Sequence, residues 1–206
     1  MFFDIVFPNR NEDEFIELAP RLGYNGLYFI YNYDKNINKY EEKIKKLQKN
    51  TKLKLSYGFI IPLKDTNKIK KTKALIFIKS SSKNRFVIEK NKANILFGLE
   101  EHAKEDFIHH RASGLNQVLC KLASKNKIII GFSFNSILKN KKNSYKILGR
   151  MMQNIWLCRK YKIKTLTGSF SEQPYEMRSV YDLISLFFVL GMSKEEIRNS
   201  FDINFF

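Results

Sequence analysis

The segment between residues 109 and 170 alternates helical and strand patterns with almost no sequence between them. Apolar residues recur at helical spacing over 112–123, and a short continuous apolar run, 128–132, follows a polar break. Such a run is typical of a strand that is covered on both faces, as in a parallel sheet. The pattern then predicts a second helix over 144–161 and a second strand over 163–167. Because helices that alternate with buried strands form right-handed crossovers, this segment predicts a parallel α/β core.

The rest of the chain can be read as further copies of the same unit. Five more strands are predicted, over residues 2–7, 26–31, 52–61, 74–78 and 93–99. Helices separate them, a closing helix is expected over 178–190, and a short helix follows. We find no linker or internal boundary, so residues 1–206 are predicted to form one domain. Seven or more strands in a chain of this length favour a small, irregular TIM-like β/α barrel with a parallel strand core, and a doubly wound open sheet is the alternative.

Three helix starts carry residue pairs at capping spacing. These pairs are Asn11 with Glu14, Ser179 with Asp182, and Ser193 with Glu196. At this spacing the first side chain accepts a hydrogen bond from a free backbone N–H of the first helical turn. Gly23 stands where a left-handed residue is expected to end the first helix.

The net charge is the most unusual property of the composition. Lysine and arginine number 37 against 20 acidic residues, which gives +17 at pH 7. Scattered lysines on solvated faces account for part of this excess, but a surplus this large creates a field that attracts polyanions. The charge therefore favours a nucleic-acid partner.

Three further features predict a cytoplasmic protein without a membrane partner. The two cysteines, Cys120 and Cys158, have no spacing typical of a zinc site or a disulfide framework, which suits a reducing compartment. No apolar run has the length needed to span a bilayer. The sequence also begins with a strand pattern rather than with a basic signal peptide.

The sequence contains few candidate catalytic or metal-ligating residues for a barrel enzyme. The three histidines all lie between residues 102 and 110, and the first strand offers only Asp4. A metal-dependent phosphoesterase would need histidines or carboxylates from several strand ends, converging on its ions. There is no Gly-x-Ser-x-Gly elbow, no Walker-type phosphate loop and no Gly-x-Gly-x-x-Gly. We therefore predict no catalytic residue and no metal ligand in this chain.

The basic side chains are more informative. A His-His-Arg block is expected at the entrance of the helix in the 109–123 segment, where backbone N–H groups favour an anion, and a solvated helix start is the alternative. A lysine-rich stretch follows the sixth strand at the predicted carboxyl-end rim, and the next helix presents Lys146, Arg150, Gln153 and Lys160 on one face. Arg159 lies toward the apolar side of that helix, and Arg178 follows the last strand. The predicted phosphate-contacting residues are His109, His110, Arg111, Lys139, Lys141, Lys142, Lys146, Arg150, Arg159, Lys160 and Arg178.

Several motifs in the C-terminal half occur in an order and spacing that resemble a known family. They are residues 114–123 followed by 128–133, residues 154–161, Gly168-Ser169, and 176–184 with the ending 190–192. Together they resemble the ribonuclease P protein component 3 family over residues 106–201. The N-terminal half is similar in its layout and at residues 22–25. Phe170 departs from the pattern, since the family usually has a small residue after the Gly-Ser pair.

This resemblance implies a TIM-barrel-like subunit of the ribonucleoprotein that removes 5′ leaders from precursor tRNA. In that family the RNA performs the cleavage with magnesium, and the protein pairs with component 2 to support the catalytic domain of the RNA. The implied partners are ribonuclease P RNA, precursor tRNA and ribonuclease P protein component 2. The protein itself is expected to bind no cofactor, with magnesium held through the RNA.

Two alternatives remain open at the level of sequence. One is a metal-dependent barrel phosphoesterase that acts on a small phosphorylated substrate. The other is a scaffold that binds only protein, with Phe201, Phe205 and Phe206 as docking points. If the RNA-binding interpretation holds, Arg150→Ala or Arg178→Ala should weaken RNA binding without unfolding the domain.

Overall fold

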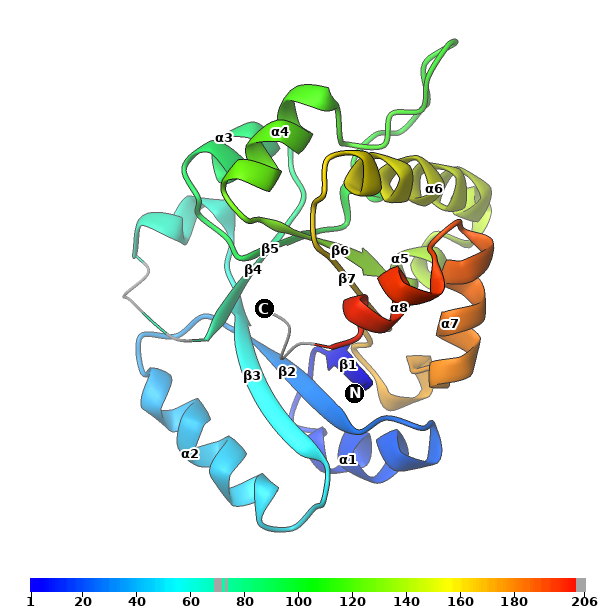
Figure 1. Cartoon of the computed structure of the whole chain (residues 1–206). Coiled ribbons are helices and arrows are strands. Elements are labelled where there is room, and N and C mark those ends of the chain that lie inside the picture. The colour runs from blue at the N-terminus through cyan, green and yellow to red at the C-terminus, as the bar shows by residue number, and fades with distance from the viewer. Residues whose placement is uncertain (69–71, 73, 203–206) are drawn as a thin grey trace.

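Seven parallel strands form the centre of the molecule in the computed structural model, which describes residues 1–68, 72 and 74–202. Each strand pairs with the next one along the chain, so the sheet order is the sequence order (Figure 1). The strands are β1 (Phe3–Val6), β2 (Gly26–Asn32), β3 (Lys54–Ile60), β4 (Leu75–Lys79), β5 (Ile95–Phe97), β6 (Ile129–Ser133) and β7 (Thr165–Gly168). All seven lie at predicted positions. This order gives a nearly closed barrel, so the open-sheet alternative is wrong.

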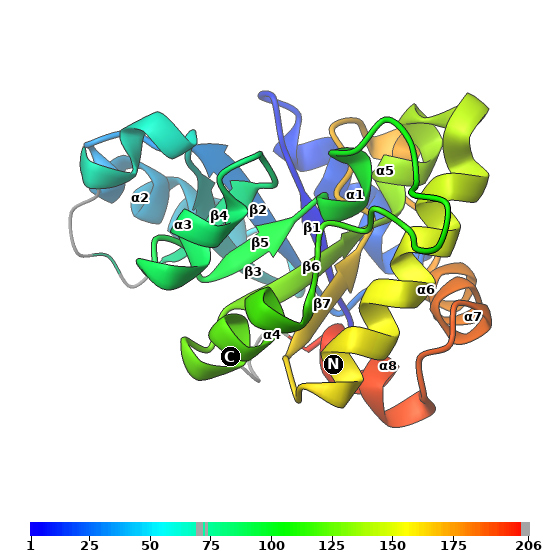
Figure 2. The same ribbon diagram turned by 90° about the horizontal axis from the view of Figure 1, so that it is seen from above.

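Helices surround the strands on the outside (Figures 1 and 2). They are α1 (Glu12–Arg21), α2 (Ile37–Gln48), α3 (Asn84–Glu89), α4 (Gln117–Lys125), α5 (Phe134–Lys139), α6 (Ser144–Lys160), α7 (Val180–Val189) and α8 (Lys194–Ser200). Short 3₁₀ turns occur at η1 (Leu63–Lys68), η2 (Leu99–Glu101), η3 (Lys141–Asn143) and η4 (Pro174–Glu176). No helix in the described part of the chain combines the length and apolarity that crossing a bilayer requires.

Two of the three predicted caps are confirmed. The Ser179 side chain accepts from the N–H of Asp182, and Ser193 forms a complete capping box with Glu196. Asn11 precedes α1 as predicted, but its side-chain oxygen accepts from the N–H of Asn9 instead of from the helix. Gly23 takes the predicted left-handed conformation, with φ +87°.

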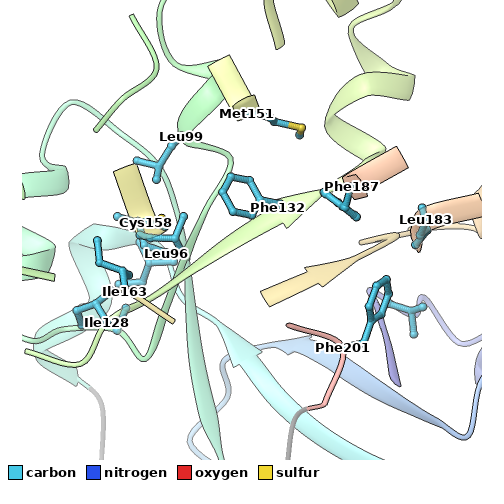
Figure 3. Close-up of a cluster of buried hydrophobic side chains, with 14 of the residues drawn as sticks. Leu96, Leu99, Ile128, Phe132, Met151, Cys158, Ile163, Leu183, Phe187 and Phe201 are labelled. Atoms are coloured by element: carbon cyan, nitrogen blue, oxygen red, sulfur yellow. The ribbon is translucent and has the colours of Figure 1, made fainter. Parts of the chain in front are cut away.

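Both faces of the strands are buried, which explains their continuous apolar sequences. In β6 and the residue before it, Ile128, Ile130 and Phe132 belong to the core between sheet and helices, whereas Ile129 belongs to a second core inside the barrel. Phe132 packs near Phe187 of α7, with ring centroids 6.4 Å apart (Figure 3). The interior core contains Ile5, Tyr28, Ile30, Phe77, Ile95, Phe97, Ile129, Leu166 and Phe170.

The seam between β1 and β7 is closed by side chains and by one isolated bridge. Val6 pairs with Ser171, and the N–H of Phe7 donates to the Ser171 carbonyl at 2.7 Å. The Asp4 carboxyl accepts from the N–H and the hydroxyl of Ser169, both at 2.6 Å. Asp4 therefore joins the first strand to the end of the last.

Candidate functional site

The polar side of α6 is covered by the segment that links η2 to α4. Figure 2 shows this segment running alongside the helix. Arg150 is its main anchor: its side chain is only 2% exposed and its Nε donates to Asp106 Oδ1 at 2.7 Å. Arg150 Nη1 donates to the carbonyls of Glu100 at 2.8 Å and Ala103 at 2.7 Å. One guanidinium thus fixes η2, through Glu100, and two points of the covering segment, Ala103 and Asp106.

Neighbouring α6 side chains extend this contact along the helix. Asn154 Nδ2 donates to Glu100 Oε1 and to the Ser113 carbonyl, both at 2.8 Å. Gln153 Nε2 donates to Ser113 Oγ at 2.9 Å, and Lys146 forms an ion pair of 2.6 Å with Glu105. Three of the four side chains of the predicted phosphate-tracking stripe, Lys146, Arg150 and Gln153, thus contact the covering segment, while Lys160 stays exposed. Helical periodicity marked the face as polar, but the partner of that face is the protein itself.

Two carboxyl groups are buried: Glu100 in η2, under α6, and Asp4 in β1, at the barrel seam. The sequence analysis assigned no role to either of them. Burial raises the pKa of Glu100 to about 7, and its Oε2 has no hydrogen-bond partner. Burial also raises the pKa of Asp4 to about 6, although the hydrogen bonds from Ser169 and Ile5 oppose the rise. Both groups hold structure together through hydrogen bonds to neighbouring segments.

The tip of the covering segment projects from the barrel (Figure 1). The N–H of Phe107 donates to the His110 carbonyl at 3.0 Å, the two rings stack with centroids 4.5 Å apart, and Ile108 is 96% exposed. His109, His110 and Arg111 are all exposed here. Their predicted place at a helix entrance is wrong, because α4 begins only at Gln117, after the Asn116 cap.

The Arg111 side chain packs against α6 at Gly149. A Cβ at Gly149 would meet Arg111 Nε at 2.8 Å, so a side chain at this position would displace the guanidinium from its place against α6. The Lys146–Glu105 ion pair holds the same segment beside the first turns of α6, which directly follow η3. In η3, Lys141 and Lys142 are exposed and form no ion pair with any described residue. We call His109, His110, Arg111, Lys141 and Lys142 together the basic edge.

The other predicted cations have partners within the protein. Lys139 forms an ion pair with Glu172, and Arg159 forms one with Glu196 while donating to the Gly191 carbonyl. Arg178 donates to the carbonyls of Tyr175, Glu176 and Met177 and places its guanidinium 5.2 Å from the Phe134 ring. Lys160 lies 4.9 Å from the Trp156 ring. Arg159 and Arg178 therefore brace the C-terminal helices, whether or not they also contact RNA.

The carboxyl-end mouth of the barrel holds a cavity of about 600 Å³. Phe7, Phe97 and Phe170 line it, with ring centroids 5.2 to 6.2 Å apart. Ion pairs of Lys79 with Glu101 and of Lys139 with Glu172 balance the charges at this mouth. Within the described residues, no group of three His, Cys, Asp or Glu side chains gathers to form a metal site. The aromatic ring of Phe170, which follows Gly168-Ser169, occupies the part of the mouth where a smaller residue would leave space for an anion.

Comparisons with known proteins agree with this architecture. The sequence matches the family described as RNase P subunit p30 over residues 1–204. A ribonuclease P protein component 3 from Methanocaldococcus jannaschii is 29% identical over an alignment that covers 89% of this chain and 79% of that protein. The component 3 protein of Methanosarcina acetivorans is 30% identical over 47% of this chain and 42% of that protein.

A solved structure supports the same assignment. A chain in a cryo-EM structure of archaeal ribonuclease P with mature tRNA is 25% identical to this one, with a TM-score of 0.79. The superposed region covers 96% of this chain and 86% of that chain. The family match spans nearly the whole sequence, and the barrel and its covering helices account for that match in three dimensions. The chain therefore belongs to the RNase P subunit p30 family and is a protein subunit of ribonuclease P.

Proposed function

We propose that this subunit binds ribonuclease P RNA and stabilises the RNA fold that removes 5′ leaders from precursor tRNA. The whole-chain match to RNase P subunit p30 carries the proposal. The net charge of +17 supports it, because a strongly basic domain screens the phosphate repulsion that opposes RNA folding. Cleavage itself is assigned to the RNA, with magnesium bound through the RNA rather than through this chain.

The basic edge is the part of the surface that we assign to phosphate contact. Its side chains are exposed, and the Lys146–Glu105 ion pair keeps its two segments close together. The stacked rings of Phe107 and His110 beside it offer a flat surface for an unpaired base. Lys160 is exposed on the outer side of α6 and is a further candidate. Lys139, Lys146, Arg150, Arg159 and Arg178 act mainly by holding these elements in place.

We also propose the partners and the compartment that the family resemblance implies. Component 2 of ribonuclease P would bind this chain, and precursor tRNA would approach the assembled particle. A cytoplasmic location suits two buried, unpaired cysteines, Cys120 and Cys158.

Reconstitution tests the proposal. Ribonuclease P RNA, component 2 and precursor tRNA are combined in magnesium with and without this chain, and 5′ leader release is measured. We expect the chain to raise cleavage at low magnesium, where phosphate repulsion is least screened. The isolated chain is assayed in parallel with magnesium and a phosphomonoester. Hydrolysis there, together with no effect on leader release, would support the phosphoesterase alternative instead.

A further inference from the structure

Helix α7 is apolar on both of its sides, although only one side packs against the barrel. Val180, Leu183 and Phe187 face inward and are buried, as Figure 3 shows for the last two. The opposite side contains Tyr181, Ser185, Phe188 and Val189, which we call the outer face of α7, whereas Ile184 is half-buried and packs against the core. Within it, Tyr181 is 78% exposed, Phe188 55% and Val189 75%. The spacing from Tyr181 through Ser185 to Phe188 and Val189 is the i, i+4, i+7, i+8 pattern of one helical stripe.

A surface helix normally presents polar residues to solvent. Figure 1 shows α7 on the outside of the barrel, with no described segment beyond it. Contiguous exposed apolar side chains of this size mark a surface that another molecule covers. The outer face of α7 therefore has the properties of a binding surface, and its charge pattern indicates which kind of molecule binds there.

The charge pattern excludes RNA as the preferred occupant. Between Arg178 and Lys194 the sequence contains no lysine or arginine, whereas the whole chain contains 37. The only charged side chain in this interval is the exposed carboxylate of Asp182. RNA affinity depends on cations that neutralise phosphates, so RNA has no favourable contact to make here.

A second copy of this chain is also a poor occupant. Two chains that each carry +17 repel one another at long range. Removal of aromatic and aliphatic side chains from water is, in contrast, the usual driving force of protein–protein association. An uncharged or basic border on the partner would suit the Asp182 carboxylate.

We propose that the outer face of α7 binds a different protein subunit of the ribonucleoprotein, through an apolar surface with an uncharged or basic border. This inference rests on the proposed function for the choice of component 2 as the probe. It assigns the protein partner to α7 and leaves the basic edge to RNA. The two surfaces can then be occupied independently.

Calorimetric titration of the full chain with purified component 2 from the same organism tests the inference. Tyr181→Asp and Phe188→Ser should each weaken binding at least about 30-fold, because exposed aromatic residues at such interfaces dominate affinity. Val118→Asp is the matched control: Val118 is equally exposed but lies on α4, so its substitution should leave the affinity within about 2-fold. Thermal unfolding of each variant shows whether the fold is retained, and Tyr181→Asp alters a side chain with little buried surface to lose.

Each other outcome has a definite meaning. Unchanged affinity in both α7 variants, or no binding of component 2 by the unaltered chain, would overturn the docking inference. Loss of RNA affinity in these variants would show that the face binds RNA, and a dimer of the unaltered chain that the same variants dissociate would assign the face to a second copy. RNA binding and leader release by the unaltered chain report separately on the proposed function.

Discussion

Replacement of Arg150 by alanine should destabilise the protein, because this side chain connects α6 to the segment between η2 and α4. The buried guanidinium forms an ion pair with Asp106 and donates to two carbonyls. Loss of one partner of a buried pair typically costs about 3–5 kcal/mol. Asp106 is 27% exposed and can be rehydrated, which places the expected cost near the lower end, at about 3 kcal/mol. In a domain of this size, that cost lowers Tm by about 6–12 °C.

Urea denaturation followed by circular dichroism measures this cost. Arg85→Ala is the matched control, because Arg85 forms an exposed i,i+4 pair with Glu89 and its loss should cost less than about 0.5 kcal/mol. Hydrogen exchange adds a local readout: amides between Leu99 and Asn116 should lose protection in Arg150→Ala and keep it in the control.

A cost below about 1 kcal/mol for Arg150→Ala would refute the anchoring role. If such a stable variant also lost RNA affinity, direct phosphate contact by Arg150 would be the better explanation. That result would restore the prediction made from sequence alone, in which this residue contacts RNA without supporting the fold.

Three further predictions concern other parts of the molecule. The raised pKa of Asp4, about 6 against 3.8 in the unfolded chain, means that its protonated form stabilises the fold at low pH and that this contribution is lost as the pH rises through 6. The stability of Asp4→Asn relative to the unaltered protein should therefore rise by about 2 kcal/mol between pH 4 and pH 7, measured by urea denaturation. Lys141→Ala combined with Lys142→Ala should reduce the slope of log affinity for ribonuclease P RNA against log salt by about 1 to 2, and Lys125→Ala on α4 should leave that slope unchanged in filter binding. Phe170→Ala should cost about 3–5 kcal/mol, because its ring fills the barrel mouth, and a smaller loss in denaturation would show that the mouth collapses around the gap.

Strand positions could be predicted because strands that are buried on both faces have continuous apolar sequences. The run 128–132 is apolar at every residue except Gly131, since Ile130 faces the outer core and Ile129 the inner one. Caps could be predicted for a similar reason: Ser179 and Ser193 bond to groups only three residues away. Local chemistry of this kind does not depend on the tertiary partner.

The start of α4 was misplaced because the apolar spacing from Ala112 to Leu115 continues into the helix. Leu115 is buried, but Gly114 has a φ of +82° and lies so close to Leu99 that a Cβ would meet the Leu99 carbonyl oxygen at 2.7 Å. This segment packs as an extended cover rather than as a helical turn. Apolar periodicity records which residues are buried and does not record the backbone conformation that buries them.

Ion pairs within the protein determine which of its basic side chains can contribute to RNA binding. Lys146, Arg150 and Arg159 on α6, and Lys139 at the end of α5, all form ion pairs with carboxylates of the protein itself, which offset part of their charge. Arg111, Lys141 and Lys142 of the basic edge form no ion pair with any described residue, and α7 contains no lysine or arginine. Ion pairs along α6 and the lack of lysine and arginine on α7 therefore make these two helices poorer phosphate contacts than the basic edge. This asymmetry supports our proposals that RNA contacts the basic edge and that a protein subunit contacts the outer face of α7.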